Sequence, residues 1–277
     1  MDLYSDALKI LKGTSRTFYI PIIRLPLGLQ EAVASAYLCF RAIDEIEDHP
    51  ELDNPTKAKL LHAISLTLQE ARVDGFSIDA FSMGFRPYEH LLPEVSTRIR
   101  DWTLLAPGTI APRIWDAIAA MADRMAFWAE VNWKIETQSD LDRYTFSVAG
   151  AVGLLLSDLW AWYDGTQTNR TLAIGFGRGL QVVNMLRNHT EDLSRGVDFF
   201  PQGWSPEDMQ KYARHNLSMA DTYTNALPAG PALDFCQIPL TLAYGTLQAL
   251  ENGKDKLSRS DVVALIEPLI GMNMNAI

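Results

Sequence analysis

Two stretches of the chain carry oxygen-bearing side chains at helical spacing. In the first, FRAIDEIED, Asp44 and Asp48 lie four residues apart, so both carboxylates share one helix face a turn apart. Like charges at this spacing repel each other, so a counter-charge is required. The residues from Ala32 to Ile43 are apolar nearly all round, which predicts a buried helix. A solvated acidic helix end is the alternative interpretation, but a carboxylate pair on a buried helix is typical of a Mg²⁺ site.

The second stretch, QVVNMLRNHTEDLSRG, places several oxygen-bearing side chains on one helix stripe. Asn184, Asn188 and Asp192 fall at i, i+4 and i+8, and Gln181 lies one turn earlier. An ordinary polar stripe on a surface helix has the same pattern. Here Arg187 and Arg195 flank the stripe. Guanidinium groups beside oxygen ligands favour an anionic group, such as a phosphate, held jointly by metal and arginine.

A glycine pair lies between these two stretches, in the segment from Tyr144 to Gly153. Gly150 and Gly153 each destabilise a helix by roughly 1 kcal/mol relative to alanine, so both require a reason. Close helix packing is one interpretation. The other is a slot for an apolar chain, lined by Ala149 and the two glycines.

The elements that must position these residues are helices, because no alternating apolar pattern of useful length occurs. A helix is predicted from Leu29, after Pro26 and Gly28, to Asp48, before His49-Pro50. Short breakers rich in Gly and Pro separate the helices, and no internal repeat or linker divides the chain. The sequence therefore predicts one all-α domain over 1–277. The further helices are expected at about 55–71, 88–100, 112–136, 140–163, 168–193, 206–225, 231–251 and 259–270.

Composition excludes several classes of function. The 277 residues include 24 Lys and Arg and 34 Asp and Glu, a formal net charge of −10, which argues against a nucleic-acid partner. Cys39 and Cys236 form neither a zinc pattern nor a disulfide framework. No signal peptide or membrane span is apparent, so a cytoplasmic location is expected. The apolar segment from Asp261 to Ile277 leaves a peripheral membrane contact open, and nothing fixes the oligomeric state.

Four pieces of the sequence together resemble the squalene and phytoene synthase family. They are SRTFY from Ser15, YLCFRAIDEIED from Tyr37, the segment from Tyr144 to Gly153, and the segment from Gln181 to Pro201. They occur in the order and at the separations of that family, over most of the chain. The resemblance implies a single-domain helical isoprenoid-synthase fold with a central cavity. It also implies head-to-head joining of two prenyl diphosphates through a cyclopropylcarbinyl diphosphate.

The resemblance further implies a role for each matching residue. Mg²⁺ would be held by Asp44, Asp48, Asn184, Asn188 and Asp192. Ser15, Arg16, Arg41 and Arg187 would contact diphosphate, and Tyr37, Tyr144, Gln181 and Tyr244 would lie along the reacting ends of the chains. The FRAIDEIEDHP wording is closer to squalene synthases, which favours C15 farnesyl donors over C20 ones. No dinucleotide fingerprint is present, and in this family that absence leaves the use of NADPH open.

Two positions depart from the family pattern. Asn188 stands where an aspartate is usual, so the second cluster has one negative charge fewer for holding a metal ion. Asp198 stands where a basic residue is common. The Asn184, Asn188, Asp192 stripe also resembles the metal triad of class I terpene cyclases, which act on one prenyl diphosphate. A terpene cyclase and a catalytically weakened paralogue that binds prenyl lipid are therefore the alternatives.

Overall fold

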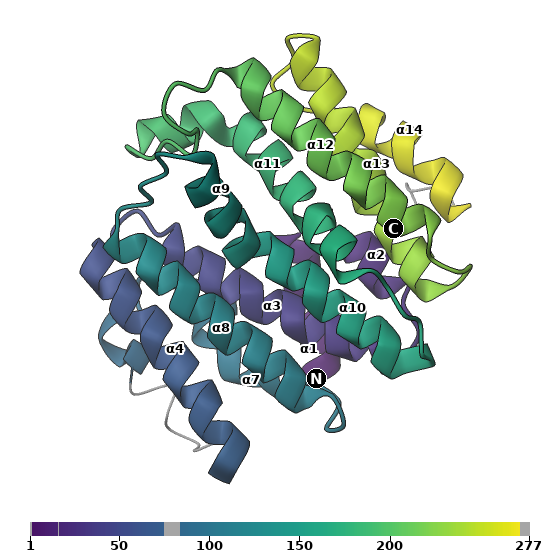
Figure 1. The fold of residues 1–277 in the computed structure, drawn as a ribbon. Coiled ribbons are helices and arrows are strands. Elements are labelled where there is room, and N and C mark those ends of the chain that lie inside the picture. The colour runs from purple at the N-terminus through teal and green to yellow at the C-terminus, as the bar shows by residue number, and fades with distance from the viewer. Residues whose placement is uncertain (1, 16, 75–83, 272–277) are drawn as a thin grey trace. The chain divides into compact units, whose positions relative to one another are not determined.

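The computed structural model describes residues 2–15, 17–74 and 84–271, and helices make up the regular structure of these ranges (Figure 1). No strand occurs within them, so the all-α prediction is confirmed. The chain divides into two compact units, 1–133 and 134–277, and each is described by itself. The expectation of one domain over 1–277 stays a prediction.

The first unit is built around a central helix. Helix α3 (Leu29–Glu47) packs against the other helices of the unit, and α4 runs beside α8 (Figure 1). A run of apolar side chains from Leu29 to Ile46 is buried on α3, which confirms that this helix is enclosed on nearly all sides. The other elements are α1 (Leu3–Thr14), α2 (Tyr19–Ile23), α4 (Asn54–Asp74), the 3₁₀ turn η1 (Arg86–Tyr88), α6 (Glu94–Thr97), α7 (Ile99–Leu104) and α8 (Ala111–Glu130).

Hydrogen bonds from small polar side chains lock α3 to its neighbours. The Ser35 hydroxyl donates to the carbonyl of Trp102 at 2.7 Å, and the Ser96 hydroxyl donates to the carbonyl of Ala42 at 2.9 Å. All four groups lie in the core, where an unpaired hydroxyl would be unfavourable. These bonds fix the rotation of α3 about its axis, and with it the direction of the acidic residues at its end.

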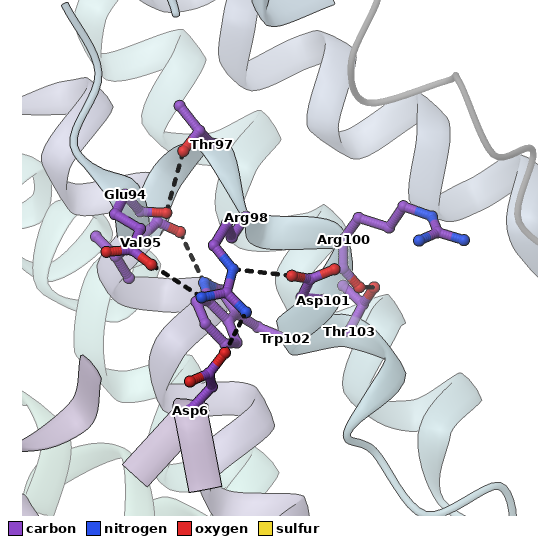
Figure 2. Close-up of polar contacts among 9 residues, drawn as sticks. All are labelled: Asp6, Glu94, Val95, Thr97, Arg98, Arg100, Asp101, Trp102 and Thr103. Atoms are coloured by element: carbon purple, nitrogen blue, oxygen red, sulfur yellow. Dashed lines mark hydrogen bonds and ion pairs between the residues drawn. The ribbon is translucent and has the colours of Figure 1, made fainter. Parts of the chain in front are cut away.

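Arg98 joins three elements of the first unit (Figure 2). Its guanidinium donates to Glu94 at 2.8 Å, to Asp101 at 2.9 Å and to Asp6 of α1 at 3.2 Å, and lies 4.6 Å from the centre of the Trp102 ring. These carboxylates raise the pKa of Arg98 although burial opposes the shift. Arg98 thus holds α1 against the short helices that support α3.

The expectation of one helix at 88–100 is wrong. The structure has instead the end of η1, then α6 and α7 as separate short helices. Pro93 precedes α6 in an extended conformation, and Arg98 leaves the helical region with φ −101° and ψ 19°. A proline disfavours helix at the residue before it, which explains the first break, and the side-chain bonds of Arg98 stabilise the second.

The second unit surrounds a long helix, α11 (Arg170–Ser194). Each of α9, η2, α10, α12 and α13 packs against it. The predicted bounds of the last three helices agree with the structure. The elements are α9 (Gln138–Thr145), the π-helical turn η2 (Phe146–Gly150), α10 (Ala151–Asp164), α12 (Pro206–Asn225), α13 (Pro231–Glu251) and α14 (Arg259–Ile270).

One stretch of the described chain, Gln138–Asp164, is long and apolar enough to cross a membrane. Its most apolar part is 44% buried inside the structure, and core helices of soluble proteins can be equally long and apolar. The stretch comprises α9, η2 and α10, all packed on α11. The expected absence of a membrane span rested on a shorter run and stays a prediction, as do the cytoplasmic location and the peripheral membrane contact.

The glycine pair serves close helix packing. A Cβ on Gly153 would overlap the carbonyl oxygen of Ala173 on α11, and one on Gly150 would lie 3.1 Å from the Ile174 side chain. The crossing is reciprocal, because a Cβ on Gly177 would overlap the carbonyl oxygen of Ala149. The close-packing interpretation is therefore confirmed, and a slot lined by these residues is not needed to explain them.

We expect Gly153→Ala to lower the free energy of unfolding by at least ~2 kcal/mol, because the added methyl group forces α10 away from α11. Denaturant unfolding measures this change. Gly13→Ala is the matched control, since Gly13 lies in α1 and an added methyl group there would have no atom within 4 Å beyond the adjoining backbone of its own helix. That variant should be unchanged or gain up to about 1 kcal/mol from helix propensity. Equal stability of the two variants would contradict the close crossing.

Candidate active site

The last turn and a half of α3 carries the first cluster of predicted site residues. Asp44 is half-buried and Asp48 is exposed as the residue that caps the helix, with its N–H donating to the Asp44 carbonyl at 2.8 Å. Their separation of four residues within one continuous helix places both carboxylates on the same face. The structure therefore brings Asp44 and Asp48 together as predicted from their spacing.

The electrostatics of this cluster favour a bound cation. Burial raises the pKa of Asp44 to about 7; the charge of Arg41 opposes the shift, and the charges of Asp48 and Glu45 add to it. Burial and the two neighbouring carboxylates thus outweigh the charge of Arg41, and further positive charge would stabilise the ionised form. A divalent ion between Asp44 and Asp48 would supply that charge.

Arg41 lies one turn before Asp44, and one of its hydrogen-bond donors lacks a partner among the described residues. One terminal nitrogen of its guanidinium is paired with Glu45, four residues later on the same helix. Its Nε atom is buried and has no hydrogen-bond partner among the described residues. An arginine with a free buried donor beside a carboxylate cluster is suited to bind an anion that also contacts a metal ion.

The structure brings Tyr37 and Ser15 together on the same side of the first unit. Burial raises the pKa of Tyr37, and a hydrogen bond with Ser15 opposes that shift. The Ser15 hydroxyl also accepts from the backbone N–H of Phe18 at 2.9 Å, and the Phe18 ring lies 5.6 Å from the Tyr37 ring. Arg16, predicted to contact diphosphate, lies outside the described residues.

A buried group that the sequence analysis missed lies at the end of α3. Glu47 and Lys57 are each 7% exposed, and Glu47 accepts a hydrogen bond from the indole nitrogen of Trp133. Burial raises the pKa of Glu47 to about 8, with further increases from Asp48 and Asp44. The acidic pentad alone gives no signal that Glu47 points into the protein, because only the fold places Trp133 opposite it.

The second cluster lies along the C-terminal half of α11. Asn184 is exposed, Gln181 and Asn188 are half-buried, and Asp192 is buried. Arg195 donates to Asp192 at 2.5 Å, and Arg187 Nε donates to the Asn188 side-chain oxygen at 3.1 Å. The predicted stripe is therefore present on one helix, with each guanidinium group adjacent to one of its oxygen atoms.

Aromatic side chains after α11 support Tyr144 and the second cluster. Phe199 stacks on Tyr144 with ring centres 4.8 Å apart, and Phe200 stacks on His189 of α11 at 3.9 Å. Tyr144 is the residue before the last of α9 and precedes the π-helical turn η2. Such turns are frequent at functional sites. Asp198, one of the two departures from the family pattern, has a carboxylate oxygen 3.4 Å from Nε2 of His189.

The Tyr244 hydroxyl forms its hydrogen bond with a residue outside the set of predicted site residues. Its hydroxyl donates to Asp221, so this bond joins α13 to α12, and burial raises the pKa of Tyr244 to about 12. This hydrogen bond directs the hydroxyl to α12 rather than to the α11 stripe. The predicted role of Tyr244 along the reacting chains stays a prediction.

The donor set fits Mg²⁺ better than a transition metal. Among the described residues, no group of three or more His, Cys, Asp and Glu side chains is placed to hold a metal ion. Each cluster by itself offers oxygen ligands: a carboxylate pair on α3 in the first unit, and amide and carboxylate oxygens on α11 in the second. Mg²⁺ prefers oxygen ligands and commonly keeps waters or takes substrate phosphates for the rest of its shell. A metal that depends on a bound diphosphate is consistent with this set.

Comparison with known proteins agrees with the family resemblance of the sequence motifs. The family model described as squalene/phytoene synthase matches residues 11–210. The squalene synthases of Schizosaccharomyces pombe and Homo sapiens are each 27% identical, over 89% and 93% of this chain. The chain spans 59% and 67% of the length of these two relatives.

Solved structures show a similar fold. The complex of TcSQS with the ligand E5700 superposes with a TM-score of 0.78 at 22% identity, covering 96% of this chain and 85% of that one. A dehydrosqualene synthase in complex with a ligand gives a TM-score of 0.64 at 18% identity, covering 97% and 95%. The helical architecture is therefore the one seen in these two proteins.

Proposed function

Because the chain belongs to the squalene/phytoene synthase family, we propose that it is a Mg²⁺-dependent prenyltransferase that joins two prenyl diphosphates head to head. The observation that carries the proposal is the α3 cluster. Arg41, whose buried Nε has no hydrogen-bond partner among the described residues, precedes Asp44, whose pKa is raised by burial and by the charges of Asp48 and Glu45. This combination suits a metal-bound diphosphate, which brings a cation for Asp44 and Asp48 and an anion for Arg41.

Each predicted residue has a role in this proposal. Bound Mg²⁺ supplies positive charge that neutralises the departing diphosphate. Its ligands are Asp44, Asp48, Asn184, Asn188 and Asp192, while Ser15, Arg16, Arg41 and Arg187 bind diphosphate oxygens. Tyr37, Tyr144, Gln181 and Tyr244 lie along the reacting chains, where aromatic faces stabilise a carbocation and exclude water.

Farnesyl diphosphate is the proposed donor, on the resemblance of FRAIDEIEDHP to squalene synthases. The test is incubation with farnesyl or geranylgeranyl diphosphate and Mg²⁺, with and without NADPH, followed by mass analysis of the extract. A C30 product from farnesyl diphosphate is expected, and NADPH should change its identity if the chain completes the reduction to squalene. A cyclic C15 product with one diphosphate released per product would favour a terpene cyclase instead.

Asn188 is the feature that favours the two alternative functions, the terpene cyclase and the weakened paralogue. Its substitution by aspartate distinguishes them. We expect Asn188→Asp to lower the Mg²⁺ concentration for half-maximal rate by about 3- to 10-fold without changing the product, because it adds a carboxylate to the metal ligands. The measurement is the initial rate across a Mg²⁺ titration, with product analysis at saturation.

Other outcomes for Asn188→Asp point to the alternatives. A lower kcat or a changed product would indicate a cyclase site adjusted to the amide. A silent wild type with an active variant would indicate a weakened paralogue. Identical Mg²⁺ dependence, products and melting temperature would show that Asn188 is not at the metal.

A further inference from the structure

Trp133 occupies an unusual backbone conformation at the end of the first unit. Helix α8 ends at Glu130 in a Schellman motif: the N–H of Asn132 bonds to the Ala129 carbonyl at 3.1 Å and the N–H of Trp133 to the Trp128 carbonyl at 2.9 Å. The motif accounts for the φ of +54° at Asn132. It does not require Trp133 to adopt a φ of +49°, which is rare for a bulky residue.

The strained turn is held by a second contact. Asn54, the first residue of α4, donates from its side-chain nitrogen to the Asn132 side-chain oxygen at 2.6 Å. Strain of this kind is typical of positions whose side chain must be placed in one direction. The turn therefore fixes where the Trp133 indole points.

The indole points at the last residue of α3. Its nitrogen donates to the Glu47 carboxylate, and the Lys57 ammonium lies 5.2 Å from the centre of the Trp133 ring. Trp133 is 8% exposed, so this cluster is buried. Three helices meet here, since Glu47 ends α3, Lys57 lies in the first turn of α4 and Trp133 follows α8.

We propose that Trp133 is a positioning residue for the cation site: its hydrogen bond holds Glu47 inward and fixes the turn of α3 that presents Asp44 and Asp48. This inference rests on the proposed function and adds a residue to it. Glu47 then acts as an anchor within the protein, although it stands between two proposed ligands. Outer partners of this kind typically change metal affinity by about 10- to 100-fold when they are removed.

The test measures binding of Mg²⁺ with inorganic diphosphate by calorimetry, so that it does not depend on turnover. In Trp133→Phe, which keeps an aromatic ring but loses the N–H, we expect the Mg²⁺ concentration for half-saturation to rise about 10-fold. Trp115→Phe is the matched control, because it removes an indole bond to the Thr103 carbonyl at 3.2 Å in the same unit. That control should stay within about 2-fold of wild type.

Two variants of Glu47 keep the inference testable if Trp133→Phe does not fold. Glu47→Gln retains an oxygen that accepts from the indole and should stay within about 3-fold of wild type, while Glu47→Leu should weaken Mg²⁺ binding by about 10-fold or more. Equal, strong weakening in both Glu47 variants, with Trp133→Phe like wild type, would show that Glu47 is itself a metal ligand and would overturn the inference.

The indole N–H signal of Trp133 in a ¹⁵N-labelled protein gives a second readout. It should move in Glu47→Gln and keep its position when Mg²⁺ and diphosphate are added to wild type. If adding Mg²⁺ and diphosphate shifts this signal to the position of a free indole, the inference is overturned, because Glu47 would no longer accept the hydrogen bond of Trp133. Absence of a condensation product with intact diphosphate binding would refute the proposed function alone.

Discussion

Asp44→Ala should reduce turnover of prenyl diphosphate by at least ~100-fold, with a larger effect on kcat than on KM. The carboxylate is half-buried on α3, and burial together with the charges of Asp48 and Glu45 raises its pKa. In the proposed function, its removal eliminates one of the few anionic oxygens that would hold the cation at the departing diphosphate. Loss of one fixed electrostatic contact to developing charge typically reduces rate by about 10²- to 10³-fold.

The same experiment includes controls for charge and for metal. Glu31→Ala removes a carboxylate from the first turn of the same helix and should leave turnover within about 2-fold of wild type. Excess EDTA should abolish wild-type activity, and added Mg²⁺ should restore it. An Asp44→Ala enzyme with wild-type turnover, or full activity in EDTA, would remove the α3 cluster from the reaction.

Capping signals explain why the helices of the second unit could be predicted closely. Ser205 and Ser258 each accept from the backbone N–H three residues later, and Asp208 and Asp261 complete two capping boxes. Gly230 followed by Pro231 marks the start of α13 in the same local way. Where a boundary is encoded within four residues, the sequence is sufficient.

The missed elements depend on contacts that are distant in sequence or on weaker local signals. Helix α8 ends at Glu130 rather than near 136. This end was missed because Asn132 and Trp133 adopt positive φ where a Gly or Pro would have given a clear stop signal. Helix α1 was not predicted, although Asp2 caps it and Ala7 and Leu11 are buried at helical spacing. That spacing could have identified α1.

For the candidate site too, features within one helix could be predicted and contacts between separate segments could not. Spacing on a single helix was enough to predict that Asp44 and Asp48 share a face and that the α11 residues form a stripe. It could not predict that Glu47 points inward to Trp133, nor that Phe199 stacks on Tyr144, because both contacts join separate segments. Side-chain partners across elements are set by packing, which a helical pattern does not describe.

Arg41→Met should be as damaging to the reaction as the loss of Asp44, for the opposite reason. The guanidinium has one nitrogen on Glu45 and a buried Nε without a hydrogen-bond partner among the described residues. If that donor binds diphosphate, its removal should lower kcat/KM by about 10²- to 10³-fold. Lysine lacks the planar fork of arginine, so Arg41→Lys should recover only part of the loss.

A structural role for Arg41 predicts a different result. Its pair with Glu45 is about one-third exposed, with side-chain exposures of 34% and 30%, so breaking it should lower the free energy of unfolding by about 1 kcal/mol or less. Arg214→Met breaks another Arg–Glu pair, with Glu251, and should leave kcat/KM within about 2-fold of wild type. A loss in Arg41→Met that follows its melting temperature and is matched by Arg214→Met would place Arg41 among the structural ion pairs. A large loss of kcat/KM at unchanged stability would assign Arg41 to substrate binding.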